Sequence, residues 1–155
     1  MLSAAARAEV AALGESYAEP TSALMPAFWV AQRELGYVPA EAAREIAEIL
    51  GVQAGYAAGV LSFYTMYNRE PVGKYVLQVC RTLSCSLMGA EGLLHHLEGR
   101  LGIGVGDTTL DGRFTLLTAE CLASCGTAPA MLINEELYEE LTPGRLDEIL
   151  AGLPA

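Results

Sequence analysis

Four cysteines are the residues of this chain that point most directly to a chemistry. They are the only cysteines among 155 residues, and they fall into two close pairs. Cys80 and Cys85 form a C-x4-C pair, and Cys121 and Cys125 form a C-x3-C pair. Thiolates bind zinc and iron–sulfur centres, and two such pairs can close around one small inorganic centre. The spacing therefore predicts a metal centre.

Several chemistries compete at these thiols. A [2Fe–2S] cluster takes two thiolates on each iron, which fits two separate pairs in wide loops. A structural Zn²⁺ ion more often uses C-x2-C knuckles, and a dithiol oxidoreductase needs a C-x-x-C motif, which the chain lacks. Four inert buried thiols are the simplest alternative. The loop widths favour two irons over one zinc, and the zinc interpretation stays open.

The N-terminal residues and the lack of a long apolar run favour a reducing compartment. Residues 1–7 carry one early positive charge and lack the apolar core of a signal peptide. No run of about 18 apolar residues occurs, so no membrane-spanning helix is expected. We therefore expect a cytoplasmic chain, in which disulfides are disfavoured.

The charge pattern excludes further classes of function. The formal net charge is −10, and the 9 lysines and arginines form no run, which argues against nucleic-acid binding. The chain has no Ser/His/Asp set, no phosphate-binding Walker loop and no dinucleotide fingerprint. His95 and His96 are adjacent, so they face different directions on a helix and are expected to be surface or packing residues.

The first 70 residues are predicted to be helical. The alanine-rich segment 4–13 is followed by apolar residues at helical spacing up to Gly36. Pro39 is suited to the first position of a third helix, which ends at Gly51. The apolar segment 60–67 is compatible with a strand or a helix, and the three-to-four spacing of Tyr56, Val60, Phe63 and Tyr67 favours a fourth helix. We expect a helical bundle over residues 1–70.

A turn-rich segment, residues 68–73, predicts the domain boundary, and the periodicity changes beyond it. Strands are predicted at 75–79 and 114–119, and a hairpin at 130–133 and 137–140. Helices are predicted from Leu87 to Leu101 and from Thr142 onward. The order β-α-β-β-α predicts an α/β domain over residues 71–155, in which flanking helices cover a four-stranded sheet.

This arrangement would bring the cysteines to one end of the sheet. Cys80 and Cys121 each follow a strand, and open α/β sheets present ligands at the carboxyl ends of their strands. Cys85 lies where a helix begins, so free N–H groups can stabilise negative charge on sulfur. The apolar neighbours expected to limit water access are Leu83, Leu122 and Ala123.

Segments around the cysteines and in the first half carry a family resemblance. They are residues 73–75, 79–85, 88–90, 101–103, 108–115 (TTLDGRFT), 120–125 (ECLASC) and 128–134, together with 36–39 and 59–64. In these segments the chain resembles the 24-kDa-type [2Fe–2S] subunits of NADH-quinone oxidoreductase (respiratory complex I), a family of thioredoxin-like ferredoxins. The resemblance covers nearly the whole chain and implies a thioredoxin-like fold for residues 71–155.

The resemblance implies that Cys80, Cys85, Cys121 and Cys125 bind one [2Fe–2S] cluster. It implies a larger flavoprotein partner that holds NADH, FMN and a [4Fe–4S] cluster, with residues 1–70 helping to dock it. The chain would be an enzyme subunit without a complete NADH or FMN site or catalytic residues of its own. Its cluster would accept single electrons from the flavin, at the cytoplasmic face of the inner membrane. The alternatives are the equivalent diaphorase subunit of an NAD-linked hydrogenase or formate dehydrogenase and, more remotely, a structural zinc-binding module.

Three positions depart from the family pattern. Ala123 and Ser124 stand where the family usually has Gly-Ala, which matters if the backbone at residue 123 needs a positive φ. Leu110 replaces a common proline and is expected to affect only a turn. None of the three is a cysteine.

Overall fold

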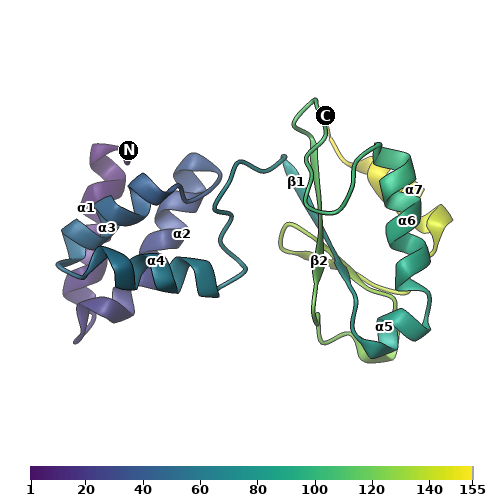
Figure 1. Ribbon diagram of the computed structural model, residues 1–155, viewed down its shortest axis with the longest axis horizontal. Helices are drawn as coiled ribbons and strands as arrows, with labels where there is room; N and C mark the ends of the chain where they lie inside the picture. Colours follow the sequence, from purple (N-terminus) through teal and green to yellow (C-terminus); the bar gives the residue numbers. More distant parts are fainter. Residues whose placement is uncertain (155) are drawn as a thin grey trace. The chain divides into compact units, whose positions relative to one another are not determined.

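Helices form the first part of the chain, as its alanine content and apolar spacing predict (Figure 1). The structure, a computed structural model, describes residues 1–154. It divides into two units, Met1–Pro71 and the chain from Val72 onward. The first unit consists of α1 (Ala4–Ser16), η1 (Pro20–Ala23), α2 (Leu24–Leu35), α3 (Ala40–Leu50) and α4 (Ala54–Phe63).

Glycines end two of these helices as predicted. Gly36 follows α2 with φ 80°, and Gly51 follows α3 with φ 67°, backbone conformations that glycine adopts without steric cost. Pro39 lies one residue before α3, as its N-cap, and the prediction that it begins the helix was wrong by one position. Gly14 lies inside α1, where a Cβ would come within 2.8 Å of Leu50 on α3, so the two helices approach closely there.

The fourth helix is shorter than predicted because the chain turns inward after Phe63. Tyr67 is buried, and its hydroxyl donates a hydrogen bond to the carbonyl of Met25 over 2.9 Å. Its ring meets the ring of Phe28 edge-on, with 5.4 Å between centroids. This long-range anchoring overrides the helical spacing of residues 64–67 and leaves Phe63 78% exposed.

The second unit is the α/β domain that the sequence predicts. Its elements are β1 (Tyr75–Cys80), α5 (Leu83–Leu87), α6 (Ala90–Leu101), β2 (Phe114–Ala119), η2 (Cys125–Thr127), β3 (Met131–Ile133), β4 (Glu136–Tyr138) and α7 (Pro143–Gly152). Within the described residues these strands form one sheet in the order β2-β1-β3-β4, with β1 parallel to β2 and the other neighbours antiparallel. Helices α6 and α7 cover one face of this sheet (Figure 1). The thioredoxin-like α/β architecture is confirmed.

Two local predictions in this unit needed correction. The single helix expected from Leu87 to Leu101 is two helices, because Gly89 takes a left-handed backbone with φ 94° between α5 and α6. The hairpin turn is also tighter than expected, since Asn134 adopts φ 55° and β4 begins at Glu136. None of the helices in residues 1–154 combines the length and apolar character needed to cross a bilayer.

The anchoring of Tyr67 can be tested with Tyr67→Phe. Removing the hydroxyl leaves the Met25 carbonyl without this donor, and we expect unfolding of the helical unit to cost about 1 kcal/mol less. The measurement is urea denaturation followed by far-ultraviolet circular dichroism. Tyr56→Phe is the matched control, because Tyr56 is 55% exposed and its change should stay within about 0.5 kcal/mol. Equal effects of the two variants would contradict the assignment.

Candidate metal centre

Parallel pairing of β1 and β2 brings the four cysteines to one edge of the sheet. The register sets Cys80, the last residue of β1, opposite Ala119, the last residue of β2. Cys121 follows two residues later, Cys85 lies in α5, and Cys125 begins η2. Helix α5 lies beyond the ends of these two strands (Figure 1). The predicted convergence at the carboxyl ends of the strands is therefore observed in the backbone.

The two pairs differ in exposure. Cys80 and Cys85 are each only 3% exposed, whereas Cys121 and Cys125 are exposed. All four thiols, which lie in the described part of the chain, are free of disulfides. Within residues 1–154, no group of three or more His, Cys, Asp or Glu side chains is arranged to hold a single metal ion. The site thus has a buried side formed by the first pair and an open side formed by the second.

The surroundings of Cys80 favour negative charge on its sulfur. Burial raises the pKa of its thiol, but backbone N–H groups of Thr82 and Leu122 and the thiol of Cys85 outweigh burial and hold the pKa below its usual value. The Leu122 bond also ties the loop of the second pair to the first pair. A thiolate is the form that binds metal, so this environment favours a ligand.

The pKa of the Cys85 thiol is shifted in the opposite direction, which favours its protonated form. Burial and the hydrogen bond with Cys80 raise the pKa of its thiol, and the backbone N–H of Ala130 opposes them. The carbonyl of Ala130 accepts the N–H of Cys80 over 3.0 Å, so one residue contacts both cysteines of the first pair. Ala130 directly follows the cis peptide bond between Ala128 and Pro129. Residue-type patterns missed Ala130 because its contribution is entirely backbone.

The loop of the second pair has the left-handed turn that the family's glycine would favour. Ala123 adopts φ 58°, and its N–H donates to the sulfur of Cys121 over 3.4 Å. A left-handed conformation costs a non-glycine residue roughly 1–2 kcal/mol. Ala123 therefore holds this turn at an energetic cost that glycine would not incur.

These donors fit an iron–sulfur centre. Backbone N–H groups reach three of the four sulfurs, and such bonds stabilise the negative charge that an anionic cluster places on its ligands. Thr82 is the cap of α5, but the other donors belong to loops, so the predicted helix-start donors were only part of the set. The expected shielding was wrong for Leu83, which is 71% exposed, and for Ala123, which is also exposed, whereas Leu122 is partly buried.

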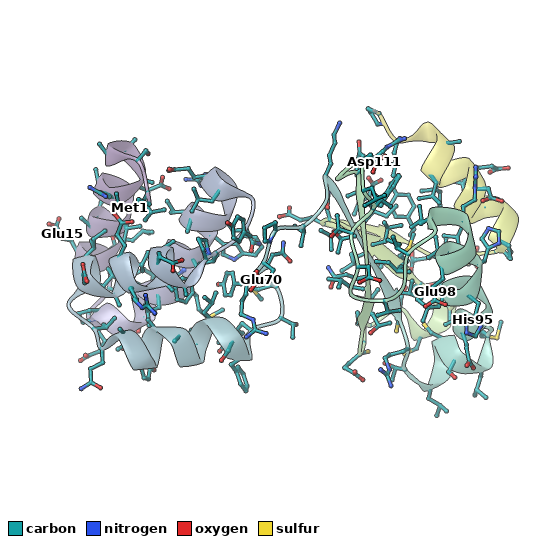
Figure 2. All side chains as sticks on the ribbon, turned by 45° about the horizontal axis from the view of Figure 1, so that its top comes forward. Met1, Glu15, Glu70, His95, Glu98 and Asp111 are labelled. Atoms are coloured by element: carbon teal, nitrogen blue, oxygen red, sulfur yellow. The ribbon has the colours of Figure 1, made fainter. Side chains whose placement is uncertain are left out.

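Other chemistry-bearing residues lie apart from this edge in structural roles. His95 is exposed on α6 (Figure 2), and His96 lies 3.1 Å from the carboxylate of Asp147 on α7. Asp111, at the turn before β2 (Figure 2), accepts hydrogen bonds from Thr109 and from the backbone N–H of Arg113. The predictions of packing residues and a plain turn agree with these contacts.

Comparison with protein families defines the class of this protein. Residues 10–154 match the family described as thioredoxin-like [2Fe-2S] ferredoxin. The match spans nearly the whole chain, including both units and all four cysteines. The chain therefore belongs to the thioredoxin-like [2Fe–2S] ferredoxin family.

Similar proteins include subunits of several bacterial NADH-quinone oxidoreductases. The chain is 43% identical to a subunit of the NADH-quinone oxidoreductase of Rhizobium meliloti, over 96% of this chain and 89% of that relative. It is 47% identical to NADH-quinone oxidoreductase subunit 2 of Thermus thermophilus, over 86% of this chain and 75% of that relative. It is 39% identical to a subunit of the NADH-quinone oxidoreductase of Escherichia coli, over 96% of this chain and 90% of that relative.

Solved structures with this fold include an NAD⁺-reducing [NiFe]-hydrogenase. In its air-oxidised state the similarity has a TM-score of 0.65 at 25% identity and covers 72% of this chain and 19% of the hydrogenase chain. In the H2-reduced state the TM-score is 0.70 at 24% identity, over 82% of this chain and 22% of that one. This chain thus spans about a fifth of the hydrogenase chain that it resembles.

The strained loop yields a stability prediction. Replacing Ala123 with glycine should stabilise the metal-free sheet unit by about 1 kcal/mol, because glycine adopts φ 58° without the Cβ clash. Urea denaturation of the metal-free protein measures the change. Ala151→Gly, at an exposed helical position of α7, is the control and should destabilise by up to about 1 kcal/mol. A loss of stability in Ala123→Gly would show that the turn is not strained.

Proposed function

We propose that this chain is the electron-transfer subunit of an NADH-quinone oxidoreductase, with Cys80, Cys85, Cys121 and Cys125 as ligands of one [2Fe–2S] cluster. The observation that carries the proposal is the convergence of two cysteine pairs, with their N–H donors, at one edge of a thioredoxin-like sheet. Relatives from NADH-quinone oxidoreductases at 39–47% identity support the choice of complex.

The two cysteine pairs have different roles in the proposed site. Cys80 and Cys85 anchor the buried side, and backbone N–H groups of Thr82, Leu122 and Ala130 offset negative charge on their sulfurs. Cys121 and Cys125 form the exposed side, which is accessible to an electron donor on a partner. When bound, a [2Fe–2S] cluster takes up and releases one electron at a time. The proposed donor is the FMN of a larger flavoprotein that also binds NADH and a [4Fe–4S] cluster.

The helical unit is the proposed docking domain for that flavoprotein. Helix α4 is apolar around its circumference, which is typical of a helix covered on several sides. Its side chains Tyr56 and Phe63 are 55% and 78% exposed in this chain. A groove of about 660 Å³ also lies along α3 and α4 within this unit, lined in part by Ala43, Ala58 and Gly59. We propose residues 1–70 as the docking domain and residues 71–155 as the cluster domain, peripheral to the cytoplasmic face of the inner membrane.

A second candidate is the diaphorase subunit of an NAD-linked hydrogenase, or of a formate dehydrogenase. The observation that favours a hydrogenase is the fold similarity to an NAD⁺-reducing [NiFe]-hydrogenase at a TM-score of 0.65. The same cysteine site would serve either host complex, so the identity of the other subunits decides between them.

Metal analysis tests the cluster directly. The reconstituted chain should contain about two irons and two acid-labile sulfides and give an electron paramagnetic resonance signal after one-electron reduction. Cys80→Ser and Cys121→Ser should each lose most of the iron while the helical unit keeps its circular dichroism. Ser86→Ala, an exposed change on α5, is the control and should retain the iron. One zinc without sulfide would instead assign a structural zinc site.

The docking role can be tested by co-purification of the flavoprotein, identified by its FMN. Phe63→Ser should weaken the association by about tenfold, since an exposed aromatic at an interface can contribute more than 1 kcal/mol. The fold should not change, because Phe63 is 78% exposed. Tyr17→Ser, at an aromatic residue that is 42% exposed after α1, is the matched control. Unchanged affinity of both variants would place the interface elsewhere.

A further inference from the structure

The segment that follows the β3–β4 hairpin runs beside the loop of the second cysteine pair. The N–H of Glu140 donates to the carbonyl of Thr127 over 2.8 Å, and the N–H of Leu141 donates to the carbonyl of Pro129 over 3.1 Å. These two bonds join residues 140 and 141 to the chain that leaves Cys125. The position of that cysteine is therefore coupled to the end of the hairpin.

Glu139 extends this pairing to the side chains around Cys125. Its carboxylate accepts hydrogen bonds from the hydroxyls of Ser124 and Thr127, and both bonds end on the same oxygen, Oε1. The two hydroxyls lie 2.8 Å apart, and Ser124, directly before Cys125, is only 9% exposed. The hydrogen bonds from Ser124 and Thr127 hold the pKa of Glu139 below its usual value, so the carboxylate is ionised at neutral pH.

The hydrogen bonds among Ser124, Thr127 and Glu139 form a clamp on the loop that carries Cys125. The left-handed backbone of Ala123 makes this loop conformation energetically costly. The hydrogen bond from Ser124 to Glu139 stabilises the same conformation. Ala123 thus adds strain to the loop, and the hydroxyl of the next residue, Ser124, supplies a hydrogen bond that offsets it.

We propose that Glu139 is a positioning residue that fixes Cys125 for the metal centre through Ser124 and Thr127. The inference rests on the proposed function for the identity of the centre, but the clamp itself belongs to the metal-free chain. Glu139 has no direct contact with the cluster in this proposal and acts only through the two hydroxyls. Outer hydrogen bonds of this type orient metal ligands and raise metal affinity.

The contribution of the clamp can be measured as the rate at which the cluster-containing protein releases iron to a chelator. Glu139→Ala should release iron about tenfold faster, at the lower end of the effect of removing an outer hydrogen-bond partner. Glu139→Gln should stay close to wild type, because its Oε1 can still accept both bonds. Glu135→Ala, the same charge change at an exposed position of the hairpin, should have no effect. The reduced Glu139→Ala protein should also show an altered paramagnetic resonance line shape that Glu139→Gln restores.

A double replacement separates the clamp from a general loss of stability. Ser124→Ala with Thr127→Val should match Glu139→Ala, and combining all three changes should add nothing further. Three outcomes would overturn the proposal. They are additive effects of the changes on the rate of iron release, a wild-type rate of iron release in Glu139→Ala, and equally fast iron release in Glu139→Ala and Glu139→Gln. Equally fast release would assign the effect to charge instead of to position.

Hydrogen exchange in the metal-free protein distinguishes failure of the clamp from failure of the proposed function. The backbone N–H groups of residues 123–127 should exchange faster in Glu139→Ala than in wild type, and Glu135→Ala should leave them unchanged. If wild type binds no iron but this difference is present, the proposed function fails and the clamp stands. If iron binds and the exchange rates are equal, the clamp fails and the proposed function stands.

Discussion

The parallel pairing of β1 with β2 is the constraint on which the site depends. It aligns Cys80 with Ala119, and a shift of one residue would turn the side chains of a strand to the opposite face. The register is fixed where β1 begins, because the N–H of Gly73 donates to the hydroxyl of Thr115 over 2.7 Å. A Cβ at Gly73 would lie 2.8 Å from the backbone of Phe114, so only glycine allows this approach. One glycine and one buried hydroxyl, both far along the strands from the cysteines, therefore help to set the register that brings the two pairs together.

Backbone dipoles supply most of the electrostatics at this edge. The first pair is buried, and burial alone would keep both thiols protonated. N–H groups from Thr82 and Leu122 reverse that tendency at Cys80 without placing a charged side chain against the sulfur. Peptide dipoles do not titrate, so their support is constant with pH. Because they come from different segments, they exist only once the sheet edge has formed, which links the site's charge balance to folding.

Local sequence patterns predicted the elements that carry the cysteines, but not the contacts that complete the site. The strand predicted at 75–79 agrees with β1 to within one residue, because β-branched and apolar residues lead directly into Cys80, and Gly36 and Gly51 marked helix ends. The break at Gly89 could not, because a glycine within an apolar spacing is compatible with a continuous helix. The roles of Ala130 and Glu139 depend on residues distant in the chain, so no local periodicity encodes them.

The loop of the second cysteine pair combines a strained backbone with a nearly buried hydroxyl. Alanine at residue 123 lacks the conformational freedom of glycine, yet it adopts φ 58° and its N–H donates to the sulfur of Cys121. Serine at residue 124 turns inward instead of toward water, where its hydroxyl meets Glu139. A polar side chain that is nearly buried is tolerated only when it is hydrogen-bonded, so Ser124 and Glu139 depend on each other. These bonds thereby link the exposed cysteine loop to the segment that follows the β3–β4 hairpin.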